Sequence, residues 1–221
     1  MTGSVAWAVA VKDLRAEARS RYAAGAVLPF AATMLLIFGF ALGPNRTLLQ
    51  QTAPGLLWLA GLFAAVDLFQ RSYQAEVDGG ALDALVLAPV HKGEVFLGKA
   101  AAAAVQVLGL LLVTGLLVVV LFGLPVVGLP LLLATAVLGV VGLSALGSLF
   151  GLLSVIGRRQ AALPVLVLPL VTPVVIAAIR ATATLTQGGS EGVAGWLGVL
   201  MAFDAAFLAT GYLVFGHLLE D

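Results

Sequence analysis

Long apolar runs separated by short polar stretches dominate the sequence. A helix needs about 20 apolar residues to cross the ~30 Å hydrocarbon core of a bilayer. Six runs are close to that length or longer: residues 26–42, 54–70, 99–122, 130–156, 161–179 and 194–216. Strands of a membrane β-barrel would instead alternate apolar and polar positions over about ten residues. The pattern therefore predicts an all-α integral membrane protein with six transmembrane helices, forming one transmembrane domain over residues 1–221.

Composition supports this assignment and excludes several kinds of chemistry. Hydrophobic residues make up 62% of the chain and charged residues 10%, whereas soluble domains have about 45–50% and about 25%. Because the chain has no cysteine, disulfides, thiolate metal sites and iron–sulfur clusters are excluded. The formal net charge of zero gives no indication of a nucleic-acid partner, and we expect the lipid bilayer to be the solvent for most of the chain.

Basic residues are distributed unevenly between the two sides of the predicted spans. One side has nine: Lys12, Arg15, Arg19, Arg21, Arg71, Lys92, Lys99, Arg158 and Arg159. The other side has only Arg46 and Arg180. Since short cytoplasmic flanks are enriched in Lys and Arg, this bias predicts a multi-pass protein of the inner (cytoplasmic) membrane with both termini in the cytoplasm.

Residues 4–22 have the pattern of an amphipathic helix. Trp7 begins a series of residues at helical spacing, and Lys12, Arg15 and Arg19 lie along one flank. Such a helix can lie in the cytoplasmic interface, with its apolar side in the acyl boundary and its bases on anionic headgroups. The alternative is a solvated run that continues directly into the first span.

The predicted cytoplasmic loop, residues 71–98, contains the most informative segment. Asp78 can cap a helix, Gly79 and Gly80 permit a sharp turn, and a short helix fits residues 81–88 before Pro89 ends it. The apolar positions of this helix are Leu82, Leu85 and Val86, with Asp83 among them. Two helical turns are not stable alone, so the segment must pack against something. Either the loop folds back on its own helix ends, or the segment is a coupling helix that inserts into a cytoplasmic partner.

Residues 93–100 match seven of the eight positions of a phosphate-binding loop. We reject a nucleotide site, because the eighth position is Ala100 instead of Ser or Thr and no strand precedes the motif. The glycines are expected to shape the loop, and Lys99 to anchor the third span at the membrane interface. Any ATP is then bound by another polypeptide.

Polar residues inside the spans offer few candidate sites. Asp67 lies four residues before Arg71 near the end of the second span, which predicts an ion pair. Asp204 lies near the middle of the sixth span, where an acid is costly; Gln106 and Thr172 could be its partners. For Asp204 both a functional and a structural role stay open.

Small residues and a second loop complete the pattern. Ser144/Ser148 and Gly147/Gly151 lie four residues apart in the fourth span, a spacing that serves close helix packing within the chain or between the copies of a homodimer. The stretch from Arg180 to Gly195 could hold a short re-entrant or interfacial helix. No residue set predicts a catalytic, cofactor-binding or metal site.

Three stretches, in this order and spacing, resemble the CcmB family of ABC-2-type permease subunits from cytochrome c maturation. They are Ala-Pro-Gly-Leu-Leu-Trp at 53–58, Leu-Asp-Ala-Leu-Val-Leu-Ala-Pro at 82–89 and Val-Leu-Val-Leu-Pro-Leu-Val-Thr-Pro at 165–173. The chain departs from the family pattern at Gln70-Arg71, where an acid usually precedes the base, and at Asp78, where the acid of the loop is displaced.

The resemblance implies a non-catalytic membrane subunit, with no cofactor of its own, that works with a cytoplasmic CcmA-like ATPase holding ATP and Mg²⁺. CcmC-like and CcmD-like membrane subunits are further implied partners. The ATPase would grip residues 78–90, and its hydrolysis of ATP would drive haem export or release of a haem-loaded chaperone. Two rival functions are a stand-alone proton-coupled transporter that uses Asp204 and a non-transporting assembly subunit.

Overall fold

The computed structural model describes residues 3–80, 89–156 and 163–220, all of which fold into helices and short connections. The elements are α1 (Gly3–Ser20), the π-helix η1 (Ala23–Val27), α2 (Leu28–Leu42), α3 (Arg46–Asp78), α5 (Lys92–Phe122), α6 (Leu129–Ile156), α7 (Leu163–Thr186) and α8 (Val193–Glu220). Six helical segments are long and apolar enough to cross a membrane. This finding confirms the predicted all-α architecture with six spans.

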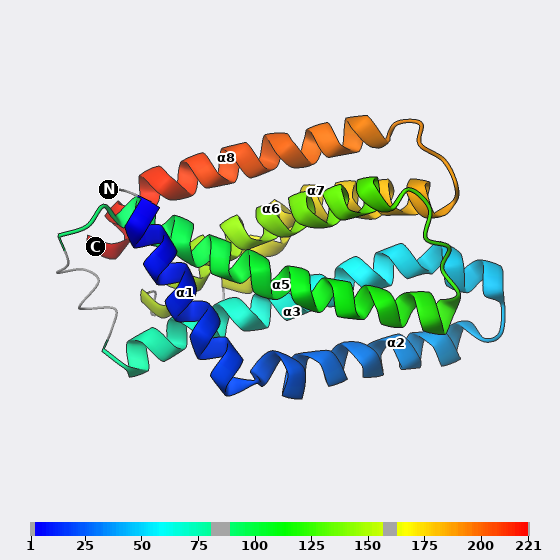
Figure 1. Ribbon diagram of the computed structural model, residues 1–221, viewed down its shortest axis with the longest axis horizontal. Helices are drawn as coiled ribbons and strands as arrows, with labels where there is room; N and C mark the ends of the chain where they lie inside the picture. The colour runs from blue at the N-terminus through cyan, green and yellow to red at the C-terminus, as the bar shows by residue number, and fades with distance from the viewer. Residues whose placement is uncertain (1–2, 81–88, 157–162, 221) are drawn as a thin grey trace.

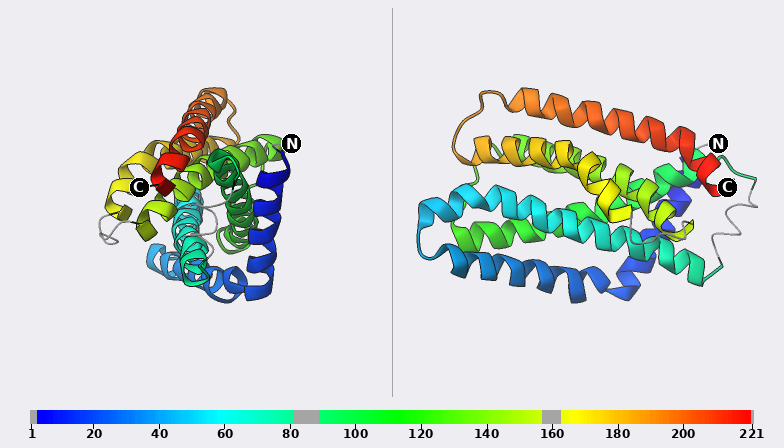
Figure 2. Two further views of the ribbon diagram at one scale, coloured as in Figure 1. Left: turned by 90° about the vertical axis from the view of Figure 1, so that its left-hand side faces the viewer. Right: turned by 180° about the vertical axis from the view of Figure 1, so that it is seen from behind.

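The spanning helices run roughly side by side in an elongated bundle, and α1 crosses it obliquely at one end (Figure 1). Both chain termini lie at this end, together with the end of α3 and the start of α5 (Figures 1 and 2). We call it the terminal end. Connections 43–45, 123–128 and 187–192 lie at the opposite end, as an even number of passes requires.

Helices α5 and α6 together form the centre of the bundle, because α6 packs against α3, α5, α7 and α8, and α5 packs against α1, α2, α3, α6 and α8. Trp58 of α3 is almost fully buried in the main hydrophobic cluster. Its indole Nε1 donates a hydrogen bond of 3.0 Å to Thr182 Oγ1 of α7. The polar atom of this large side chain is thereby satisfied in the apolar interior, as buried Trp usually requires.

Glycines of α6 receive aromatic side chains of α3. A Cβ atom at Gly139 would collide with Trp58 and one at Gly147 with Phe69, and one at Gly151 would lie 2.5 Å from Tyr73 Cδ2. The backbones of the two helices can approach closely because three glycines accept three aromatic rings. The predicted close packing at Gly147 and Gly151 is therefore found within the chain, between α3 and α6.

Helices α3 and α5 begin earlier than the apolar runs predict. The side chain of Asn45 accepts a hydrogen bond of 3.1 Å from the Leu48 amide and caps α3. His91 Nδ1 accepts one of 3.2 Å from the Gly93 amide and caps α5. Both caps satisfy amides that a helix start leaves without partners. Residues 93–100 are thus helical, and the prediction that their glycines shape a loop is wrong.

Helix α7 extends past Arg180 to Thr186, so the expectation of a further helix between Arg180 and Gly195 is wrong. Three threonines in its last turns each donate to the carbonyl oxygen four residues earlier: Thr182, Thr184 and Thr186. Their hydroxyls are satisfied without leaving the helix. Only residues 187–192 connect α7 to α8, with Gly188 in the left-handed region at φ 80°.

Candidate coupling site at the terminal end

The connection between α3 and α5 is the segment in which the sequence predicts contacts to an ATPase. The turn predicted at Gly79-Gly80 is present: both residues are exposed, and Gly80 adopts a φ of 64°. Pro89 is also exposed. The other predicted coupling residues lie outside the described part of the structure: Leu82, Asp83, Leu85, Val86 and the side chain of Asp78. Their roles stay predictions.

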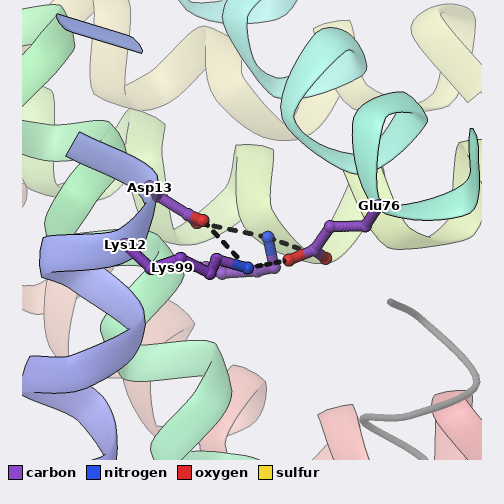
Figure 3. A network of polar contacts seen from close by, with 4 residues as sticks. All are labelled: Lys12, Asp13, Glu76 and Lys99. Atoms are coloured by element: carbon purple, nitrogen blue, oxygen red, sulfur yellow. Dashed lines mark hydrogen bonds and ion pairs between the residues drawn. The ribbon is translucent and has the colours of Figure 1, made fainter. Parts of the chain in front are cut away.

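Next to this connection, two lysines and two acids form a closed ring of ion pairs between three helices (Figure 3). Lys12 and Asp13 come from α1, Glu76 from α3 and Lys99 from α5. Lys12 Nζ lies 2.6 Å from Glu76 Oε1 and 3.2 Å from Asp13 Oδ1. Lys99 Nζ lies 2.9 Å from Glu76 Oε2 and 3.3 Å from Asp13 Oδ2. Opposite charges therefore alternate around the ring, and its formal charges cancel.

Most of the ring is removed from solvent. The side chains of Lys99 and Glu76 are 3% and 6% exposed, and Lys99 Nζ also lies 4.4 Å from the centre of the Tyr73 ring. Charges are rarely buried to this extent unless they are paired. The pairing with Asp13 and Glu76, with added cation–π attraction, accounts for a lysine at this position.

Lys12 is the most exposed member of the ring. Burial alone would lower its pKa, but the hydrogen bond to Glu76 and the charges of Asp13 and Glu76 outweigh it and raise the pKa of Lys12 above its usual 10.5. The contribution of Lys12 to stability is thus fully present below pH 10.5 and is lost only as the pH rises through the higher folded-state pKa. The ring keeps this charge at neutral pH.

The structure corrects the predicted role of Lys99. A lysine that anchors a span at the membrane interface would extend its ammonium toward water, whereas Lys99 turns inward to two carboxylates. Gly98 permits the arrangement, since a Cβ there would lie 2.5 Å from the Ala6 carbonyl oxygen and 2.8 Å from Val9 Cβ. Helix α1 crosses α5 at this glycine and brings Asp13 within reach of Lys99.

The other predicted residues of α1 lie on its outward side. Trp7 is 71% exposed, and Arg15 and Arg19 are exposed as well. These three line a groove of about 500 Å³ along the helix, together with Lys12 and small residues. The helix ends at Ser20, and Arg21 adopts a φ of 51° before η1 begins. The break leaves α1 separate from α2; its place in the membrane interface stays a prediction.

The predicted Asp67–Arg71 pair is confirmed. Arg71 also contacts Tyr22, the second residue after the end of α1. Arg71 Nε lies 3.9 Å from Asp67 Oδ2. The Arg71 guanidinium carbon also lies 3.3 Å above the centre of the Tyr22 ring. The terminal part of α3 therefore holds the chain on both sides of the break at Arg21, through the ring of charges before it and through Tyr22 after it.

Asp204 of α8 lies against Gly142 of α6, where a Cβ would be 2.6 Å from Asp204 Oδ1. It is buried, and within the described residues neither carboxyl oxygen has a hydrogen-bond partner. The predicted bonds to Gln106 or Thr172 are therefore not found. Gln106 instead lines a cavity of about 10 Å³ beside Lys99 and Asp13, which has room for about one water.

Sequence reasoning missed Asp13, Glu76 and Lys99 as one group. One sequence signal for this group was present. In a chain with only 10% charged residues, acids and bases such as Glu76 and Lys99 lie near the ends of apolar runs, where they can pair. Pairing them required the crossing of α1 over Gly98, which the sequence pattern does not specify.

Comparison with known proteins identifies the family. The model of the family described as "CcmB protein" matches residues 4–220. "Heme exporter protein B" of Pseudomonas aeruginosa is 34% identical over 178 residues, which cover 79% of each chain. The protein of the same name from Paracoccus denitrificans is 34% identical over 76% of this chain and 78% of its own, and that of Rhodobacter capsulatus 32% identical over 83% of each. The chain therefore belongs to the CcmB family.

Proposed function

We propose that the chain is the membrane permease subunit of an ATP-driven haem exporter and that a separate cytoplasmic ATPase acts on residues 78–90. Family membership carries the first part, since the relatives are named as haem exporters. The second part is supported by the end of α3 at the terminal end, where an exposed Gly79-Gly80 turn leads into the proposed coupling segment. The chain itself supplies no catalytic group to hydrolysis.

In this proposal, ATP closes the partner ATPase, and the closure displaces the apolar segment 81–88 that rests in it. The displacement passes into α3 and α5 and rocks the spans, a transition of the hinge and shear type. The cargo is haem itself or a haem-loaded chaperone released from CcmC-like and CcmD-like membrane subunits. ATP and Mg²⁺ stay on the ATPase.

Replacing Leu82 or Leu85 with aspartate should weaken binding of the ATPase by about tenfold or more, since a charge would replace an apolar contact of the interface. Co-purification of the subunits and ATP hydrolysis by the complex measure the effect. Ser190→Asp, at an exposed position of the opposite end, is the matched control and should leave both unchanged. Undiminished association and activity in both leucine variants would contradict the coupling role.

Both termini and residues 78–90 should face the cytoplasm, as the excess of basic residues at this end indicates. Because the chain has no cysteine, single cysteines can report the orientation. Ala18→Cys on α1 and Ser190→Cys between α7 and α8 are both exposed positions. A membrane-impermeant maleimide should label Ser190→Cys in intact spheroplasts and Ala18→Cys only after permeabilisation. The reverse pattern would place the coupling segment on the wrong side for an ATPase.

The burial of Asp204 without a hydrogen-bond partner in the described residues favours one second candidate, a proton-coupled transporter. Asp204→Asn keeps the shape of the side chain and removes its titration. Under the main proposal this variant should retain export and ATPase activity within about twofold, because the ATPase supplies the energy and a polar group of equal size stays in place. Loss of export with ATPase association and activity intact would support the proton-coupled alternative.

A further inference from the structure

The ring of Lys12, Asp13, Glu76 and Lys99 joins α1 to both helices that bracket the proposed coupling segment. Glu76 lies three residues before Gly79, near the end of α3, and Lys99 lies in the first turns of α5. Their 2.9 Å ion pair ties the two ends of the connection together at its base. From α1, Lys12 pairs with Glu76 and Asp13 pairs with Lys99, so α1 is joined to both helices.

One further contact holds α1, and another holds the chain just after α1, to the same pair of helices. On one side of the ring, Ala6 and Val9 lie directly over Gly98 of α5. On the other side, Tyr22 lies under the guanidinium of Arg71 of α3. Two attachments along α1 and a third at Tyr22, just past its end at Ser20, fix the direction of the helix as well as its position. Helix α1 is therefore attached to the base of the α3–α5 connection along its length.

The ion pair between Lys99 and Glu76 is shielded from water, because the two side chains are only 3% and 6% exposed. Ion pairs that are buried are screened much less than exposed pairs, and separating one leaves an uncompensated charge in a medium of low polarity. Each lysine contacts both acids and each acid contacts both lysines. Moving any one of the three helices away breaks two pairs at once.

We propose that these four residues form a latch that positions the base of the α3–α5 connection and makes α1 move with it as one body. The latch rests on the proposed function, because residues 78–90 are where the ATPase would act. A displacement of the connection is then delivered to α1 directly, without passing along the spans. The exposed side of α1, with Trp7, Arg15 and Arg19, moves with the coupling segment.

Paired charge reversals test the latch, since the ring alternates in sign. Lys12→Glu with Asp13→Lys keeps the pair within α1 attractive but sets like charges against Glu76 and Lys99. Glu76→Lys with Lys99→Glu keeps the pair between α3 and α5 attractive and sets like charges against α1. All four changes together restore every pair with opposite polarity. The net charge of the chain is the same in all three variants.

Distances between spin labels on α1 and α3 provide the measurement. Ala16→Cys and Ala75→Cys are small, exposed positions in a chain without cysteine. In the purified full chain, the labels should give one narrow distance in the native ring and in the fourfold variant. Either paired reversal should broaden or shift that distance. A narrow, unchanged distance in both paired reversals, or no recovery in a folded fourfold variant, would overturn the latch.

Measurements on the complex with the ATPase distinguish a failure of the latch from a failure of the proposed function. With the native ring, the same distance should stay unchanged when ATP is added, and a change would show that α1 moves independently and would overturn the latch. The paired reversals should retain the ATPase but lose most ATP-dependent export, which the fourfold variant should recover. If no ATPase associates with the native chain, the proposed function fails, and the distances in the purified chain still decide the latch. If the paired reversals do not fold, the ATP-dependent distance in the native ring decides it alone.

Discussion

Replacement of Lys99 by methionine is expected to lower the free energy of unfolding by about 3–5 kcal/mol, the range for removing one partner of a buried ion pair. Methionine fills much the same space but leaves Asp13 and Glu76 with Lys12 as the one remaining cation of the ring. The carboxylates of Asp13 and Glu76, whose side chains are 12% and 6% exposed, would then share one ammonium that is itself 53% exposed. Thermal unfolding in detergent, followed by helical circular dichroism, measures the loss.

Arg19→Met is the matched control for this substitution. It also exchanges a long cation for methionine, but at an exposed position of α1, where changes usually stay within about 0.5 kcal/mol. Equal stability of the two variants would mean that the ring contributes nothing to the fold. The further substitution Glu76→Gln in the Lys99→Met chain should recover part of the loss, because it removes one of the two stranded charges.

Replacement of Gly147 by alanine is expected to destabilise the protein by about 1–3 kcal/mol, as overpacking of a well-filled core does. The added methyl group would collide with the ring of Phe69 on α3. Phe69 and Gly147 are both buried between two spans, so the helices would have to separate or the ring leave its position. Thermal unfolding of the purified chain measures the change.

Gly109→Ala is the control for the glycine substitution and should have the opposite sign. Gly109 lies inside α5, and a Cβ there would meet nothing within 4 Å. Alanine should stabilise this helix by about 0.5–1 kcal/mol, because glycine loses more backbone freedom on folding. Phe69→Leu in the Gly147→Ala chain should recover part of the stability. A loss at Gly147 that is independent of residue 69 would contradict the assigned contact.

The sequence could predict the number of spans because bilayer thickness sets a minimum length for apolar runs. It predicted the ends of these helices less well, since polar residues extend them beyond the hydrocarbon region. Residues 92–98 carry charges and glycines typical of a loop, yet the His91 cap begins α5 there. Thr182 and Thr186 likewise continue α7, because their hydroxyls bond to carbonyl oxygens of the same helix.

The candidate site was predicted only where neighbours in sequence are neighbours in space. The Asp67–Arg71 pair follows directly from a spacing of four residues on a helix. The ring of charges does not, because its members come from α1, α3 and α5, which lie far apart along the chain. Helices that are apolar on all sides give no angular information from sequence, so the crossing of α1 over Gly98 could be seen only in three dimensions.

The ring also sets an order for folding during synthesis, because its residues are made at different times. Lys99 follows Asp13 by 86 positions, so at about 5–20 residues per second a ribosome needs roughly 4–17 s between the two. During that interval α1 has emerged, but its acid has no α5 to meet, and Glu76 emerges before Lys99 as well. Closure of the ring, and with it the docking of α1 on α5, must therefore wait until the start of α5 has been synthesised, so α1 reaches its final place later than its position in the chain suggests.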